Sequence, residues 1–181
     1  GAHHNDIAYW AIGLLAPERV QAKRLSEPIA GGYNACSDYE VDYTYANGIA
    51  LKIRTTPDDS IFGAVVKKDG QRNGIRFEGT DGWIWVNRAT IEASYKDLLT
   101  APLPDQAVRL YKSDNHMGNF FDCVRSRALP ICDVEIGHRS ASMCHLGAIA
   151  LRTGRALRWN PQKERFVGDH AAEANAYQVR E

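Results

Sequence analysis

Residues 39–56, YEVDYTYANGIALKIRTT, contain two short segments in which apolar and polar residues alternate, on either side of Asn47-Gly48. Alternation with a period of two is typical of a half-buried β-strand. Asn-Gly favours the tight turn that joins two antiparallel strands. We therefore predict a β-hairpin with strands in YEVDYTYA and IALKIRTT, and an antiparallel sheet as the basis of the fold.

Further segments of the same kind lie on both sides of this hairpin. They are rich in β-branched and aromatic residues, which favour strands. They are VQAKRL (20–25), GIRFEGT (74–80), GWIWVNR (82–88), ATIEASY (89–95) and ALRW (156–159). A turn around Thr80-Asp81-Gly82 joins the second and third. The middle of the chain is therefore predicted to form an antiparallel sheet of about five or six strands.

A helix is predicted ahead of the sheet, over Asp6–Leu15. Its apolar residues recur at intervals of three and four and form one apolar face: Ile7, Ala8, Ala11, Ile12 and Leu15. Asn5 or Asp6 is the expected N-cap, and Pro17 ends the pattern. Trp10 is expected to belong to the core.

Two more helices are predicted after the sheet, and a last helical turn or two near Ala171–Tyr177. The first runs from Asn115 to Arg127 and is expected to present Met117, Phe120, Phe121 and Val124 to a core. The second runs from Val134 to Thr153, with Asp133 as N-cap and Gly154 beyond its end. Together these elements predict an α+β fold, a predominantly antiparallel open sheet with helices packed on one face, as one domain over residues 1–181.

The helix predicted over Val134–Thr153 is unusually rich in small residues. Glycine inside a helix costs about 1 kcal/mol relative to alanine, so its presence calls for a physical reason. We expect close approach by another helix or by the sheet. The small residues are Gly137, Ser140, Ala141, Cys144, Gly147 and Ala148.

Composition excludes several classes of function. Lys+Arg and Asp+Glu are both 22, and no basic run is interleaved with aromatic residues, so we expect no nucleic-acid partner. No apolar run approaches the roughly 20 residues that cross a bilayer, so we expect no membrane span. The four cysteines form no C-x-x-C pair and are expected to be reduced, as in a cytoplasmic protein, although an export signal ahead of residue 1 stays open.

His3 and His4 stand next to the first predicted helix, with Asp6 three residues from His3. A histidine beside a carboxylate is the minimal arrangement for taking a proton from a hydroxyl. Three other interpretations of the pair stay open at this point: the remnant of a purification tag, a metal site and a helix cap. His116, His138, His145 and His170 are expected to be surface or capping residues, with His138 and Arg139 as minor candidates for a cleft.

Several stretches together resemble the C-terminal domain of Gfo/Idh/MocA-type oxidoreductases. The most specific is residues 119–161, which contains DVEIGHRS (133–140). GAHHNDIAYWAIG (1–13), EGTDGWIWVNR (78–88) and ERFVGDHAAEANAY (164–177) extend the resemblance over nearly the whole chain.

This resemblance implies the second half of an enzyme that transfers hydride between NAD or NADP and a sugar, polyol or derivative. His3 matches the acid/base histidine of the family's D-x-x-x-H element, and His4, Asn5 and Asp6 would bind the substrate. The Asp four positions before His3, the E-K-P lysine and the N-terminal Rossmann domain are not in this chain. No G-x-G-x-x-G occurs in it either, so no cofactor is expected on this chain alone and its isolated form is expected to be inactive.

The resemblance also implies association into a homo-oligomer through the open face of the sheet. YEVDYTYA and GWIWVNR carry large aromatic residues at alternate positions, which would leave an apolar patch on a monomer. Complete coverage of that face by helices would instead give a monomer.

Two other functions are kept as alternatives. One is a non-catalytic carbohydrate-binding or interaction module, in which some of the eight Tyr and four Trp stack on sugar rings. The weaker one is a metal-dependent isomerase or hydrolase that uses His3, His4 and Asp6 as ligands, because three protein ligands and an open position are what catalytic zinc needs.

Overall fold

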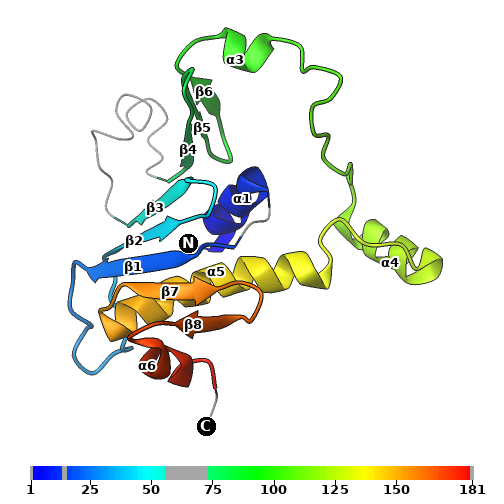
Figure 1. The fold of residues 1–181 in the computed structure, drawn as a ribbon. Coiled ribbons are helices and arrows are strands. Elements are labelled where there is room, and N and C mark those ends of the chain that lie inside the picture. Colours follow the sequence, from blue (N-terminus) through cyan, green and yellow to red (C-terminus); the bar gives the residue numbers. More distant parts are fainter. Residues whose placement is uncertain (1, 14–15, 56–72, 180–181) are drawn as a thin grey trace.

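The computed structural model describes residues 2–13, 16–55 and 73–179 (Figure 1). Its elements follow the order helix, sheet, helices that the sequence predicts. In chain order they are α1 (Ala2–Ile12), β1 (Arg19–Arg24), β2 (Tyr39–Thr44), β3 (Ala50–Arg54), β4 (Ile75–Glu78), β5 (Trp83–Val86), β6 (Ile91–Ala93), α3 (Asp97–Thr100), α4 (His116–Ser126), α5 (Val134–Thr153), β7 (Leu157–Asn160), β8 (Arg165–Val167) and α6 (Ala171–Ala176).

The described strands form two sheets, and every pair in them is antiparallel. The larger has five strands in the order β3-β2-β1-β7-β8, and the smaller has three in the order β4-β5-β6. The α+β class and the antiparallel open sheet are confirmed. The sequence did not predict the division into two sheets or strand β8, which has only three residues. Thr56, the last residue of the predicted strand IALKIRTT, lies outside the described residues.

The predicted hairpin is present as β2 and β3, with Thr44 opposite Ala50. Its turn is closed by a hydrogen bond of 3.0 Å from the Gly48 amide to the Tyr45 carbonyl. Gly48 has φ +84°, a conformation that glycine adopts without steric cost. The Asn47 side chain accepts a hydrogen bond from the Ile49 amide at 3.1 Å, so both residues of Asn-Gly contribute to the turn.

Helix α5 covers one face of the five-stranded sheet and forms the main core with it (Figure 1). Asp133 caps its start, where the carboxylate accepts from the Ile136 amide at 2.9 Å, and Gly154 ends it with φ +63°. Both ends agree with the sequence prediction. The buried residues of α5 are Met143, Leu146, Gly147, Ile149 and Ala150, which pack with Val20, Val41, Tyr43, Leu157 and Trp159.

Gly147 lies where α5 comes closest to the sheet. A Cβ placed on it would collide with the hydroxyl oxygen of Tyr43 and lie 3.3 Å from Cγ1 of Val41. The Tyr43 hydroxyl donates a hydrogen bond of 2.8 Å to the carbonyl of Met143, one turn earlier on the helix. Close approach by the sheet therefore explains Gly147. It does not explain Gly137, where an added Cβ would meet nothing within 4 Å.

The opposite face of the five-stranded sheet is polar, which corrects one sequence prediction. Tyr43 and Tyr45 of YEVDYTYA are buried on the α5 side, so they leave no aromatic patch. Alternate side chains point to opposite faces of a strand, and Asp42 and Thr44 therefore lie on the open face. Trp85 of GWIWVNR is also buried, at the position where a Cβ on Gly74 would collide with its ring.

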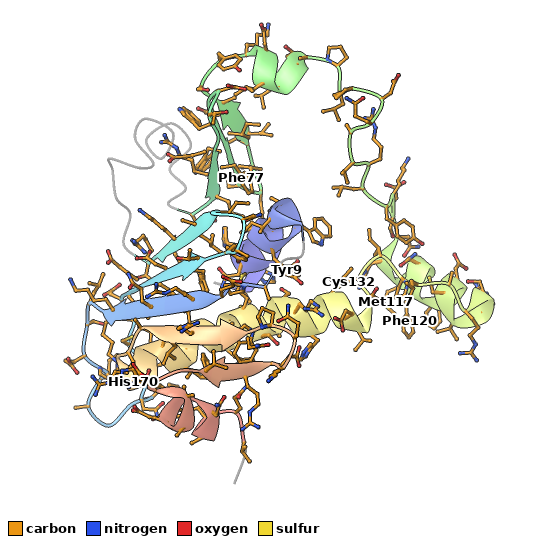
Figure 2. All side chains as sticks on the ribbon, in the orientation of Figure 1. Tyr9, Phe77, Met117, Phe120, Cys132 and His170 are labelled. Atoms are coloured by element: carbon orange, nitrogen blue, oxygen red, sulfur yellow. The ribbon has the colours of Figure 1, made fainter. Side chains whose placement is uncertain are left out.

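Helix α4 differs most from its prediction. Asn115 caps it, accepting from the Gly118 amide at 2.8 Å, but its apolar side chains do not enter a core. Phe120 and Phe121 are each 51% exposed. The segment 101–115 carries α4 away from both sheets (Figure 1), and Met117 and Phe120 lie on this separated helix (Figure 2). Of α4, only Cys123 is buried.

Replacing Gly147 by Ala is expected to lower the free energy of unfolding by about 1–3 kcal/mol, because the new methyl group displaces Tyr43 from α5. Gly147→Ala combined with Tyr43→Phe should lose less than the sum of the two single changes, since the colliding hydroxyl is gone. The measurement is urea denaturation of the four chains.

Gly137→Ala is the matched control on the same helix. It should raise the free energy of unfolding by up to about 1 kcal/mol, because space is free and alanine favours the helix. Equal effects of the two glycine substitutions would contradict this account of Gly147.

Candidate active site on helix α1

Helix α1 starts earlier in the chain than predicted. Ala2, His3 and His4 are already helical, so neither Asn5 nor Asp6 is the N-cap. Leu15, the predicted last residue of the helix, lies outside the described residues. The reason for the difference is packing. Asn5 faces α5 together with Ala8 and Tyr9, so the first turn is held in the helix by contacts that the sequence pattern does not show.

The two sides of α1 have different surroundings. Asn5, Ala8 and Tyr9 are buried against the body of the protein. Residues spaced by three, four and seven positions share one side of a helix. His3, Ile7 and Trp10 therefore form the opposite side, which is exposed, and half-buried Asp6 lies at its margin.

The predicted apolar face of this helix is therefore wrong in part, for Ile7 and Ala11, and so is the expected burial of Trp10. Ile7 is 43% and Trp10 is 40% exposed, although both are large apolar residues. Ala8 and Ile12 do pack inward, with Tyr9 and Asn5 beside them. Because α1 is apolar around most of its circumference, periodicity alone did not distinguish the side that packs on α5 from the side that remains free.

The side chain of Asn5 contacts α5 and does not lie beside that of His3. It is 8% exposed, and its side-chain amide donates to the sulfur of Cys144 on α5 at 3.4 Å. Asn5 and His3 are two positions apart, which places them about 200° from each other around a helix. On its own side of α1, Asn5 lines a cavity of about 310 Å³ together with Cys144 and Gly147. His4 is half-buried, between these two sides.

His3 and Asp6 lie one turn apart, and neither side chain makes a hydrogen bond or ion pair with a described residue, so the side-chain polar atoms are available to a ligand. An imidazole can accept and return a proton, and a neighbouring carboxylate can accept a hydrogen bond from a substrate hydroxyl. The side formed by His3, Asp6, Ile7 and Trp10 therefore offers a proton acceptor beside apolar surface.

The structure gives no support to a metal centre at this place. Within residues 2–13, 16–55 and 73–179, no three His, Cys, Asp or Glu side chains come together as metal ligands, and this includes His3, His4 and Asp6. All four cysteines are free thiols.

The start of α5 lies beside α1 and carries charged groups that already have partners. Arg139 pairs with Glu135 one turn away, and that hydrogen bond raises the pKa of Arg139. Tyr9 lies between the two helices (Figure 2), where burial raises the pKa of its hydroxyl; Arg139 opposes this and Glu135 adds to it. His138 contacts Glu164 at 2.8 Å. The His138–Glu164 contact joins α5 to the β7–β8 hairpin, and Tyr9 lies where α1 meets α5. His138 and Arg139 are therefore not part of the surface formed by the exposed side of α1.

The exposed apolar residues beside His3, Ile7 and Trp10, are the part of this site that the sequence did not predict. Ile7 and Trp10 were assigned to the core, although both share a helix side with His3. The useful signal is Asn5: a polar residue at the spacing of Ala8, Tyr9 and Ile12 shows that the buried side is not the most apolar one.

Comparison with protein families gives one match. Residues 33–180 match the model of the Gfo/Idh/MocA-type oxidoreductase family, C-terminal alpha/beta domain. No curated protein matches the sequence significantly. No helix in the described part of the chain has the length and apolar character needed to span a membrane.

Among solved structures, the fold is similar to that of the WlbA dehydrogenase from Bordetella pertussis, solved in complex with NADH and UDP-GlcNAcA. The TM-score is 0.54 at 15% sequence identity. The match covers 88% of this chain and 43% of the dehydrogenase, so the chain spans less than half the length of that protein.

Two substitutions separate the structural from the chemical side of α1. Asn5→Ala is expected to lower the free energy of unfolding by about 1–3 kcal/mol, because it removes a buried hydrogen bond and leaves a cavity. His3→Ala should change it by less than about 0.5 kcal/mol, since His3 is exposed and has no described partner. Thermal and urea denaturation of both variants measure this; a larger loss for His3→Ala would contradict the assignment.

Proposed function

Because the chain belongs to the Gfo/Idh/MocA-type oxidoreductase family as its C-terminal alpha/beta domain, we propose that it forms the substrate-binding half of an NAD(P)-dependent enzyme. The reaction is hydride transfer on a sugar, polyol or derivative. The observation that carries the proposal is the exposed side of α1, where His3 stands free beside Asp6, Ile7 and Trp10.

His3 is the general acid/base of this proposal. In the oxidation direction its imidazole takes the proton of a substrate hydroxyl as the C–H bond of the same carbon breaks, and in reduction it returns that proton. The bound nicotinamide supplies the hydride chemistry. Asp6 accepts a hydrogen bond from a second substrate hydroxyl, and half-buried His4 is placed to contact the substrate at the margin. Asn5 keeps α1 in position through Cys144.

A dinucleotide-binding domain ahead of this chain is the proposed partner. No G-x-G-x-x-G occurs among the 181 residues, so the phosphates of NAD or NADP require another unit. Two apolar surfaces are free to receive it: the Ile7–Trp10 side of α1 and the α4 side formed by Met117, Phe120 and Val124. Large exposed apolar patches mark interaction sites. We place the intact enzyme in the cytoplasm, where its four free cysteines stay reduced.

The first experiment reads the coding DNA upstream of the Gly1 codon. A strand, a G-x-G-x-x-G turn and a helix, followed by E-K-P and by an Asp four positions before His3, are expected. The longer polypeptide is then tested with NAD and NADP on sugars, polyols and nucleotide-linked sugars. An unrelated upstream sequence, or no reduction of either cofactor with any of these substrates, would refute the proposal.

In the longer polypeptide, His3→Ala is expected to lower kcat by about a hundred- to ten-thousand-fold, the usual contribution of a positioned acid/base. Initial rates and single-turnover hydride transfer measure the loss. His145→Ala is the matched control, because His145 is an exposed histidine on α5 that the proposed chemistry does not use. A similar loss of activity for both variants would remove His3 from its proposed role.

We also propose that two copies associate through the open face of the five-stranded sheet. In the structure that face is lined by charged residues of both signs, including Lys23, Asp42 and Arg54. Two such faces can pair basic with acidic positions when related by a two-fold axis.

Such a dimer should dissociate as salt is added, because the screening length falls from about 10 Å at 0.1 M to about 3 Å at 1 M. Sedimentation velocity of the chain over a range of concentrations, at low and high salt, measures this. A monomer at every concentration would contradict the proposal. A dimer that salt strengthens would point instead to the apolar surfaces of α1 and α4.

A further inference from the structure

A cavity of about 310 Å³ lies on the α5 side of the five-stranded sheet, next to the first turn of α1. Val41 and Tyr43 of β2 line it from the sheet, and Gly147 lines it from α5. These residues belong to the face that α5 covers, so the cavity is not part of the open face that we propose for association. Small-molecule sites typically enclose about 300–1,000 Å³, and this volume is at the lower end of that range.

The charged residues that line the cavity are all basic. Arg24 ends β1, Arg152 lies in the last turn of α5, and no Asp or Glu of the described chain lines the cavity with them. Arg24 donates from Nε to the Leu151 carbonyl at 3.1 Å, which leaves the N–H groups of its two terminal nitrogens. The Arg152 guanidinium lies over the Tyr177 ring at 5.9 Å, a cation–π contact that does not occupy its N–H donors. Neither arginine makes an ion pair with a described residue.

The wall between α1 and the sheet is mainly apolar, and it includes a buried polar side chain. Ile53 of β3 pairs with Val41 of β2, and both line the cavity. Asn5 lines it from α1 and is 8% exposed. Its side-chain N–H donates to Cys144 at 3.4 Å, and its side-chain oxygen accepts no hydrogen bond from a described residue. Apolar walls with a few polar groups are typical of a ligand site.

Residues 34–36, in the loop that joins β1 to β2, form one side of the cavity at the end of the sheet where α5 ends (Figure 1). The two ends of this loop are tied together, because the Leu25 amide donates to the Asp38 carbonyl at 2.8 Å. Within the loop, Ile29 is 77% and Tyr33 is 91% exposed. Surface loops closed at their base are frequently functional. A ligand at the opening gives these two apolar side chains a surface to pack on.

We propose that this cavity binds a small organic carboxylate with an apolar body. The apolar part lies among Val41, Ile53 and Leu151, and the carboxylate accepts hydrogen bonds from Arg24 and Arg152 at the opening. The planar guanidinium matches the two oxygens of a carboxylate, and the apolar walls reject a fully polar anion. The cavity is on the buried side of α1, away from the exposed side that carries the proposed chemistry, and the inference does not depend on the proposed function.

The probes are benzoate, phenylacetate and octanoate, each titrated into the 181-residue chain and followed by calorimetry. At least one of them is expected to bind about three- to ten-fold more tightly than its neutral amide, because hydrogen bonds between charged groups at an exposed opening contribute about that much. Acetate has the charge without the apolar body. It should bind at least about ten-fold more weakly than the best of the three, since it buries little apolar surface.

The cysteines of the chain report where the probe binds. Cys36 and Cys144 line the cavity, whereas exposed Cys132 does not. With the best probe at about ten times its dissociation constant, alkylation of Cys36 and Cys144 by iodoacetamide should slow about ten-fold. Alkylation of Cys132 should keep its rate and serves as the internal control. Mass spectrometry of the labelled peptides measures all three rates in one sample of the unaltered chain.

Substitutions separate the charge from the space. Arg24→Gln and Arg152→Gln should each weaken carboxylate binding by about three- to ten-fold and leave amide binding unchanged. Ala148→Phe places a ring in the cavity and should remove binding of both. Arg155→Gln is the matched control, because Arg155 follows the end of α5 and does not line the cavity. Thermal denaturation shows that each variant is folded.

Four results would overturn the proposal. They are equal affinity of all three carboxylates and their amides, equal protection of Cys132 and the cavity cysteines, full binding by a folded Ala148→Phe chain, and an equal loss for Arg155→Gln and the two cavity arginines. Loss of binding in a longer polypeptide with upstream sequence would also overturn it, because that result would show the cavity filled by the chain itself.

Discussion

The close contact between α5 and β2 is the constraint on which the rest of the structure depends. A helix approaches a sheet this closely only where a residue without a side chain allows it, and here Gly147 gives that space to Tyr43. The Tyr43 hydroxyl, buried and raised in pKa by that burial, uses its proton to hold the Met143 carbonyl. With α5 fixed on the sheet, α1 is fixed on α5 through Asn5 and Tyr9, and the orientation of His3 follows from this sequence of contacts.

Sequence patterns predicted those parts of the fold that depend on local chemistry. Asn47-Gly48 identified the hairpin, and Asp133 and Gly154 marked both ends of α5, because turns and caps are decided by residues within a few positions of each other. The side of α1 that packs inward could not be predicted in this way, because it depends on Cys144, 139 residues away. The same limit applies to α4, where an amphipathic pattern shows that a surface needs a partner but not that the partner is in the same chain.

The sequence predicted which segment carries the candidate site but not how its residues are arranged around the helix, and their roles stay a prediction. His3 is exposed with half-buried Asp6 at the margin of the same side, whereas Asn5 belongs to the packing of α1 on α5. Family resemblance alone suggested that four consecutive residues line one pocket, but a helix turns by about 100° per residue and distributes neighbours to different sides. The aromatic residues considered for sugar stacking are divided in the same way: Tyr43, Tyr45, Trp85 and Trp159 are buried, whereas Trp10, Tyr33, Tyr95, Tyr111 and Tyr177 are exposed.

The opposite orientations of His3 and Asn5 on one helix also bear on how such a protein can evolve. Substitutions on the exposed side of α1 leave its contacts with α5 intact, so this side can change its chemistry and acquire new substrates at little structural cost. Insertion or deletion of a single residue between Asn5 and Tyr9 rotates one end of the helix by about 100° relative to the other. Either the packing or the site is then lost. Divergence along this helix is therefore confined to exchange of side chains, and the length of the segment has to be inherited unchanged.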